Sequence, residues 1–164
     1  MKKYMKVTSL LVMSCIAGPP AAAAHCRVDG PSEQQIEKLS ATAFAEAKKL
    51  GVHISFSVAD DKGWPLYFKR DPEAMLVTSV LVPKKSYTSA IMKMPSGDLA
   101  ALTKPDGPLY GLNTADPKII LFAGGYPLTC NGKVVGAFGV GGGSWVQDEA
   151  IGKAVKDAYQ AFGR

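Results

Sequence analysis

The sequence predicts an α+β fold in which helices pack against one antiparallel sheet of five short strands. Apolar residues recur at helical spacing near both ends of the chain, each time behind a capping box. Between these ends, short apolar runs are separated by tight turns rich in glycine, asparagine and aspartate. Strands joined by such turns pair antiparallel. The expected order is helix, two strands, helix, three strands and helix, which is typical of helices covering an antiparallel sheet.

The first helix is expected to begin after Ser32 and to end before Gly51. Ser32 and Gln35 have the spacing of a capping box, in which each satisfies a backbone N–H of the other. The apolar positions at helical spacing are Ile36, Leu39, Ala43, Ala47 and Leu50. Gly51 suits the left-handed position that commonly closes a helix.

Two strands are expected next, at residues 52–58 and 64–70. The side chains predicted to face the core are Val52, Ile54, Phe56 and Val58. His53, Ser55 and Ser57 alternate with them and therefore face the other way. Pro65 begins the second strand, where a missing N–H is tolerated at the edge of a sheet.

A central helix is expected to begin at Pro83, because proline is favoured in the first turn. It continues over residues 84–93 and ends at the Pro-Ser-Gly sequence of residues 95–97. Residues 98–102 are expected to add one helical turn, and residues 103–117 to form a loop.

The C-terminal part predicts three strands at residues 119–123, 126–130 and 133–140. Asn131-Gly132 is the strongest hairpin signal, since a type I′ turn needs positive φ at both positions. Three glycines, residues 141–143, then lead to a second capping box formed by Ser144 and Gln147. The last helix is expected over residues 145–162.

Residues 1–24 resemble a secretory signal peptide, with a basic start, a short apolar run and an Ala-x-Ala end. We therefore expect a secreted or periplasmic protein with residues 25–164 as a single domain. Loss of the leader leaves 16 basic and 14 acidic residues, a net charge of about +2 without a basic run. This charge pattern argues against nucleic-acid binding. The apolar run of the leader is too short to span a membrane.

Cys26 and Cys130 are the two cysteines that remain after the leader. An even pair in an exported chain usually forms a disulfide, and we expect one here. The alternatives are two free thiols or metal ligands, although their spacing does not match a zinc site.

The glycine loop is the expected ligand site. Backbone N–H groups at Gly141, Gly142, Gly143 and Ser144, together with the helix dipole, are able to hold a carboxylate or phosphate. The alternative is a tight corner that needs residues without a Cβ. Asp148 and Glu149 are the carboxylates beside the loop and the candidate general acid or base, a role that would require pKa values raised by burial. No Ser-His-Asp set is evident.

Several segments in this order resemble the GlcG/HbpS family, also called the haem-degrading or DUF336 domain. They are VHISFSVADDKGWPLYFKRDPEA, KKSYTSAIMKMPS, FAGGYPL and NGKVVGAFGVGGGSWVQDEAI. The likeness covers residues 33–164 and extends to the C-terminal domain of PduO-type proteins. It implies a profilin-like fold with a five-stranded sheet, homo-oligomers, and haem binding linked in some members to haem sensing or degradation.

This resemblance implies haem between the central helix and the glycine loop, at a subunit interface. Lys84 and Lys85, with Arg70, are candidates for its propionates or for another acid, the alternative being a solvated charged face. Tyr87 is a candidate for a ligand contact. His53 and Met92 are candidates for the iron, since histidine and methionine are axial haem ligands. The chain departs from the family pattern at Gly141, at residues 70–74 and at residues 81–83, all close to the expected pocket.

Two other functions stay open at this point. The first is an enzyme that acts on a small organic acid held at the glycine loop, with Glu149 or Asp148 as base. The second is a non-catalytic, self-associating protein that binds a partner. Uptake of hemin, density for an acid at Ser144 and sedimentation behaviour distinguish the three.

Overall fold

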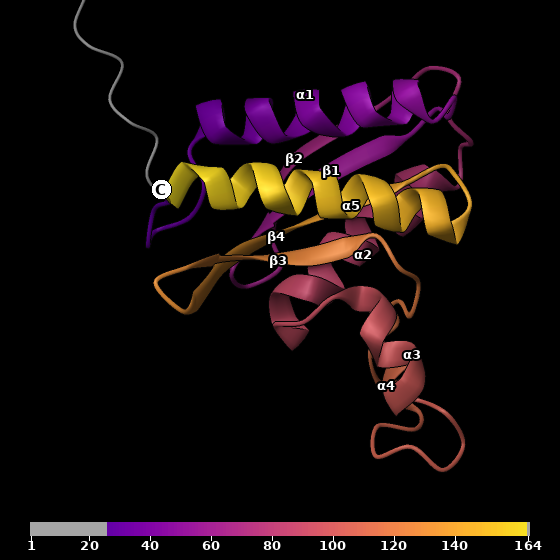
Figure 1. The fold of residues 1–164 in the computed structure, drawn as a ribbon. Helices are drawn as coiled ribbons and strands as arrows, with labels where there is room; N and C mark the ends of the chain where they lie inside the picture. Colours follow the sequence, from indigo (N-terminus) through magenta and orange to yellow (C-terminus); the bar gives the residue numbers. More distant parts are fainter. Residues whose placement is uncertain (1–25, 164) are drawn as a thin grey trace, which may run out of the picture.

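A computed structural model describes residues 26–163, and the predicted signal peptide lies outside the described residues. The described part contains one antiparallel sheet of four strands (Figure 1). The strands are β1 (Ser55–Asp60), β2 (Pro65–Arg70), β3 (Gly125–Cys130) and β4 (Lys133–Gly141). Their order across the sheet is β2-β1-β4-β3, so the two hairpins meet through β1 and β4.

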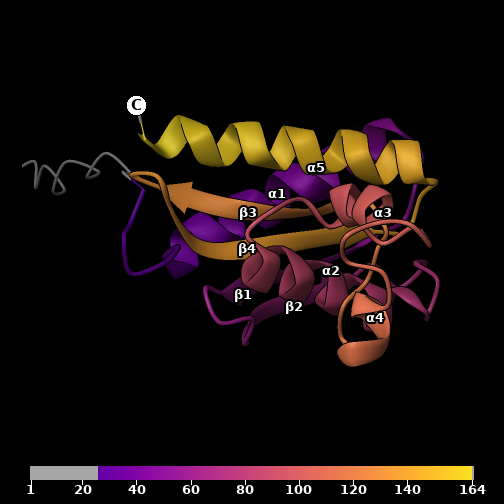
Figure 2. The ribbon, with the colours of Figure 1, turned by 90° about the horizontal axis from the view of Figure 1, so that it is seen from below.

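Helices cover both faces of the sheet. Helices α1 (Glu33–Lys49) and α5 (Trp145–Gln160) lie side by side, running in opposite directions, on one face. Helix α2 (Thr78–Met92) lies on the other face and contacts β1, β3 and β4. Figure 2 shows α5, the sheet and α2 as successive layers. The α+β class predicted from the sequence is confirmed.

The main hydrophobic core lies between the sheet and the α1–α5 pair. Three aromatic rings form its centre: the ring centroids are 5.9 Å apart for Phe56 and Phe138 and 5.6 Å apart for Tyr126 and Phe138. Phe56 is completely buried, as are Leu39 of α1 and Ile151 of α5. Leu39 and Phe56 lie at positions that the helical and strand periodicities predicted for the core.

The side chains on the opposite face of the sheet are small and polar, and α2 packs directly on them. Ser57 of β1 donates a hydrogen bond to the Val82 carbonyl, and its hydroxyl also contacts that of Ser86. A Cβ on Gly139 would stand 2.5 Å from the Val82 carbonyl oxygen, so only glycine permits this approach. Ser55 and Ser57, expected on the mildly polar face, are therefore buried beneath a helix.

The prediction of five strands is wrong, because residues 119–123 form no strand. Ile119 and Ile120 are buried, as their apolar pattern suggested. Their segment is tied to α2 by side chains instead: Thr88 accepts the Ile120 N–H, and Ser96 donates to the Phe122 carbonyl. Strand β3 is left as an edge of the sheet and carries Pro127, which is typical of an edge.

Helix α2 begins five residues earlier than predicted. Pro83 lies inside the helix rather than in its first turn, so it removes one hydrogen bond of the ladder. Tertiary contacts stabilise the added turn: the Thr78 and Ser55 hydroxyls hydrogen-bond at 2.7 Å, and Val82 is completely buried. Sequence pattern alone does not reveal such contacts.

Other local predictions agree with the structure. Both capping boxes are present, at Ser32 and at Ser144. Asn131 and Gly132 have φ values of 51° and 77°, as a type I′ turn requires. The structure contains the Cys26–Cys130 disulfide, with Cα atoms 5.5 Å apart, which ties the chain before α1 to the end of β3.

The segment between α2 and β3 contains the remaining short helices. They are η1 (Ser96–Asp98), α3 (Leu99–Leu102) and α4 (Leu112–Ala115), and α5 is followed by η2 (Ala161–Gly163). The one-turn helix expected at residues 98–102 is thus present, while α4 falls within the expected loop. Figure 1 shows this segment extending away from the sheet.

Candidate functional site

A cavity of about 420 Å³ lies where the start of α2 meets the glycine loop and the start of α5. We call it the central cavity. Its walls come from α2 and the residues before it, from residues 121–123, from the glycine loop and from α5. The lining residues are Met75, Val77, Thr78, Leu81, Val82, Lys85, Gly97, Leu121, Phe122, Ala123, Gly141, Gly142, Gly143, Trp145 and Asp148. This volume lies within the range of small-molecule sites.

A buried ion pair lies on the wall of the central cavity. Lys85 Nζ is 2.7 Å from Asp148 Oδ2, and the two side chains are 5% and 8% exposed. Lys85 also donates to the Val140 carbonyl at 2.8 Å. A Cβ on Gly141 would stand 3.0 Å from Lys85 Nζ, so glycine leaves room for the ammonium group. The pair joins α2 to α5 across the end of β4.

Two backbone N–H groups of the glycine loop donate hydrogen bonds to side chains of α5. Gly143 N–H donates to Asp148 Oδ1 at 3.0 Å, and Ser144 N–H donates to the Gln147 side chain. Gly142 has a φ of 145°, and a Cβ there would stand 2.2 Å from the His53 carbonyl oxygen. The loop is therefore a tight corner that needs a residue without a Cβ at Gly142. The Asp148 carboxylate already accepts the hydrogen bond from the Gly143 N–H that a bound anion would need.

His53 lies in a second hollow, outside the central cavity. Its Nδ1 is 3.2 Å from Asp71 Oδ2, and its side chain is 56% exposed. Hydrogen bonds from the Glu73 N–H and from His53 lower the pKa of the Asp71 carboxyl, so this group stays ionised. This hollow, the His53 hollow, has a volume of about 460 Å³ and is lined by Phe44, Ala47, Lys48, Gly51, Val52, His53 and Asp71.

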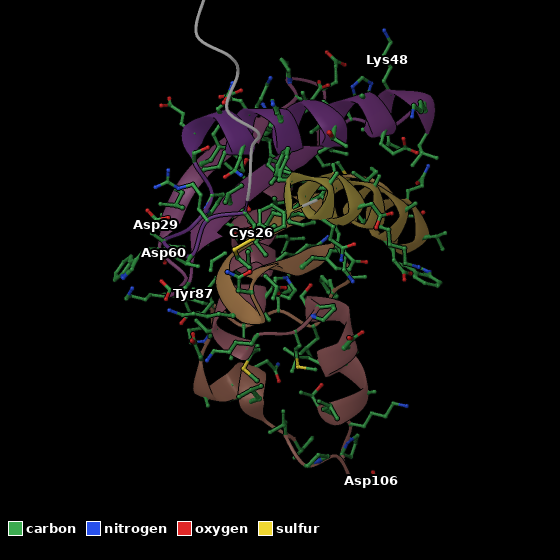
Figure 3. All side chains as sticks on the ribbon, turned by 60° about the vertical axis from the view of Figure 1, so that its left-hand side comes forward. Cys26, Asp29, Lys48, Asp60, Tyr87 and Asp106 are labelled. Atoms are coloured by element: carbon green, nitrogen blue, oxygen red, sulfur yellow. A yellow bond between two sulfur atoms is a disulfide. The ribbon has the colours of Figure 1, made fainter. Side chains whose placement is uncertain are left out.

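Two predicted site residues bond to the adjacent residues Asp116 and Pro117, and neither lines the central cavity or the His53 hollow. Tyr87 donates a hydrogen bond to Asp116 at 2.7 Å, which raises the pKa of Tyr87 and lowers that of Asp116. Lys84 donates to the Pro117 carbonyl. Figure 3 shows Tyr87 near Asp60 and far from Lys48.

The other predicted residues are also dispersed. Arg70 donates to the carbonyls of Pro72 and Ala74 at the end of β2. Met92 ends α2 and lines neither cavity. Glu149 pairs with Lys153 at 3.0 Å and lines a smaller hollow next to the central cavity.

Sequence reasoning missed the apolar walls of the central cavity and the pairing of Lys85 with Asp148. Met75, Phe122 and Trp145 are each more than half exposed, and no periodicity singles them out. One signal for the pair was available: Lys85 follows the buried Val82 by three residues and so falls on the buried face of α2.

Two negative findings hold for the described residues. No helix among them is long and apolar enough to cross a membrane. Nor do residues 26–163 bring together three or more histidine, cysteine, aspartate or glutamate side chains in a group able to hold a metal ion.

The fold and these cavities define a small α+β domain with two hollows of small-molecule size, and comparison with known proteins gives its family. The family of HbpS-like haem-degrading proteins matches residues 32–156, so the chain belongs to the HbpS-like family. The resemblance inferred from the sequence is confirmed.

Individual relatives agree with this family. The chain is 36% identical to the corrinoid adenosyltransferase PduO of Citrobacter freundii over 121 residues, 73% of this chain but only 36% of PduO. A crystal structure of the PduOC–haem complex has a TM-score of 0.76 and 34% identity, covering 79% of this chain and 94% of that one. The Klebsiella pneumoniae protein ORFY has the same TM-score with 28% identity, covering 79% and 90%.

Proposed function

We propose that this chain is an exported haem-binding protein and that His53 supplies an axial ligand to the haem iron. Family membership and the 34% identical relative solved as a haem complex support haem as the ligand. The observation that carries the choice of site is the geometry of His53, the one histidine among the described residues.

The Asp71 carboxylate prepares the imidazole of His53 as a metal ligand. A histidine that binds a metal usually donates its other ring N–H to a carboxylate, which fixes its tautomer and orientation. The 3.2 Å contact between Nδ1 and Asp71 Oδ2 meets this requirement. It leaves Nε2 as the nitrogen with a lone pair for iron.

The walls of the His53 hollow fit a flat, mostly apolar ligand with acidic edges. Phe44, Ala47 and Val52 provide apolar surface, and Lys48 provides a cation for a propionate. The central cavity has no histidine among its lining residues, so iron there would rely on Met75. Tyr87 is already bonded to Asp116, and Met92 lines neither cavity.

Hemin titration of the purified mature protein tests this proposal. We expect a shifted Soret band that saturates at one haem per chain. His53→Ala should abolish the shift or move the band, and Asp71→Ala should weaken binding by about 10- to 100-fold, as loss of such a carboxylate does at other metal sites. Following the band over time with a reductant present tests for haem degradation.

Met92→Leu and Tyr87→Phe are the matched controls, because they alter the other iron candidate and the predicted ligand contact while keeping side-chain size. Both should leave the wild-type spectrum unchanged. A wild-type spectrum equal to that of free hemin would remove haem as the ligand. An unchanged spectrum in His53→Ala would keep haem and remove His53 from the iron.

Export is a separate part of the proposal. Residues 1–24 resemble a secretory signal peptide, and the Cys26–Cys130 disulfide is typical of oxidising compartments. Expression of the full chain, fractionation and N-terminal sequencing test it. The expected result is a mature chain that begins at His25 outside the cytoplasm, and a cytoplasmic chain that retains Met1 would contradict it.

We also propose that the chain self-associates through the surface around the mouth of the central cavity. Seven large apolar side chains that line the cavity or adjoin a lining residue in the sequence are each at least half exposed: Met75, Leu76, Val77, Val80, Phe122, Trp145 and Val146. Exposed apolar groups of this size mark interaction surfaces. Sedimentation should show an oligomer that Leu76→Lys dissociates, while Val28→Lys, at an exposed apolar residue on another part of the chain, should not. A wild-type monomer would contradict this.

A further inference from the structure

We propose that the central cavity is a second ligand site, separate from the haem site. Its ligand would be a neutral small molecule with an apolar body and one head group that accepts a hydrogen bond. The two cavities share no lining residue, so this site does not depend on His53. The inference goes beyond haem binding and is tested independently of it.

The charge of the cavity wall favours a neutral ligand. Lys85 is the cation that lines the cavity, and Asp148, 2.7 Å away, already neutralises it. A carboxylate or phosphate entering beside Lys85 would lie next to Asp148, and like charges in a buried site disfavour each other. An ammonium group on a ligand would instead be repelled by the ammonium group of Lys85.

One hydrogen-bond donor on this wall is left over. An ammonium group has three N–H donors. Those of Lys85 reach two acceptors in the described part of the chain, the Val140 carbonyl and Asp148 Oδ2. The side-chain-free Gly141 lies beside Nζ on the cavity wall, so the third N–H has room for an acceptor from a ligand. A carbonyl or hydroxyl oxygen meets this need.

The remaining walls fit an apolar body. Leu81, Leu121 and Phe122 are among the apolar residues that line the cavity, and Trp145, which also lines it, is 70% exposed. The Thr78 hydroxyl also lines the cavity, but it is already engaged with Ser55 and with the Met75 carbonyl. The wall therefore offers one polar anchor in an apolar enclosure of about 420 Å³, a composition typical of small-molecule sites.

Three probes with the same ring distinguish this ligand class from others: benzamide, benzoate and toluene. They are titrated into the ¹⁵N-labelled mature protein, and the amide signals of Gly141, Gly142 and Gly143 are followed by NMR. We expect benzamide to shift these signals and to bind at least 10-fold more tightly than benzoate or toluene. The same result is expected in His53→Ala and with hemin present.

Two pairs of variants place the binding in the cavity and assign the polar anchor. Leu81→Trp fills the cavity and should abolish the benzamide shifts, whereas Val28→Trp, at an exposed apolar residue outside the lining, should not. Lys85→Met with Asp148→Asn removes both charges and keeps an oxygen for the Gly143 N–H. In this double variant, benzamide and toluene should bind within 3-fold of each other.

Several results would overturn the proposal. Benzoate binding as tightly as benzamide would make the cavity an anion site. Equal loss in both tryptophan variants, or benzamide shifts confined to residues elsewhere, would place binding outside the cavity. No measurable binding of benzamide or toluene to the folded wild-type protein would show that the cavity takes no such ligand. If Leu81→Trp fails to fold, the probe selectivity and the double variant still decide the outcome.

Discussion

Replacing Lys85 with methionine should strongly destabilise the protein, because it leaves Asp148 as a buried charge without its cation. Both side chains are less than a tenth exposed, so water screens the pair little. Breaking a buried pair by removing one partner typically costs about 3–5 kcal/mol. The Val140 carbonyl loses its donor as well, a cost of about 1–3 kcal/mol that partly overlaps the first. We expect a loss of about 4 kcal/mol, a large share of the stability of a domain of this size.

Urea unfolding followed by far-UV circular dichroism measures this loss. In thermal unfolding, it corresponds to a fall of about 10–15 °C in Tm. The control is the double variant Lys85→Met with Asp148→Asn, which removes both charges. Replacing a buried pair with neutral groups of similar size is often close to neutral. The Val140 carbonyl still lacks its donor in this variant, so we expect a remaining loss of about 1–2 kcal/mol, well below that of the single variant.

Two results would refute this reasoning. If Lys85→Met alone costs less than about 1 kcal/mol, the remaining carboxylate is not trapped in an apolar setting. If the double variant is as unstable as the single one, the loss comes from packing around Lys85 rather than from an unpaired charge. Comparing single and double variants isolates the interaction because the two side chains are in direct contact.

Three further predictions concern stability. Mutating Cys26 and Cys130 to alanine should cost up to about 4.7 kcal/mol in urea unfolding, the chain-entropy estimate for a loop of about 100 residues, and an equal midpoint for both proteins would contradict it. Burial raises the pKa of Tyr126 to about 12, so the folded state keeps a proton that the unfolded state loses near pH 10. The free energy of unfolding should therefore fall between pH 10 and 12. Unfolding measured as a function of pH should show a smaller fall in Tyr126→Phe. Gly142→Ala should cost about 2–4 kcal/mol of stability, because φ is positive there and the new Cβ would clash with the His53 carbonyl oxygen. Gly51→Ala, also at positive φ but in open space, should cost about 1 kcal/mol. Similar losses in the two variants would contradict the clash.

Local sequence signals predicted the parts of the site that depend on the nearest neighbours in the chain. The capping box at Ser144 and the glycine run before it placed a strand-to-helix corner correctly. Lys84, Tyr87 and Arg70 were predicted as ligand contacts from their charge or chemistry, yet each bonds to groups outside both cavities. A side chain that binds a distant part of the chain gives no signal in its own segment.

The haem prediction illustrates the same limit. The sequence singled out His53 as an iron candidate and the glycine loop as a pocket, and it placed one ligand at both. The structure separates them into two cavities without shared residues. The contact between His53 and Asp71 joins a residue two positions before β1 to the residue after β2. It therefore depends on the pairing of two strands.

The sequence by itself determined the α+β class, the capped helices α1 and α5 and the Asn131-Gly132 hairpin, because each depends on periodicity, capping or φ preferences within a few residues. Tertiary structure decided that residues 119–123 form no strand, that α2 begins before Pro83, and that Lys85 meets Asp148 63 positions away. These features depend on which side chains satisfy buried backbone groups and charges once the layers meet. That outcome is settled by packing over the whole chain.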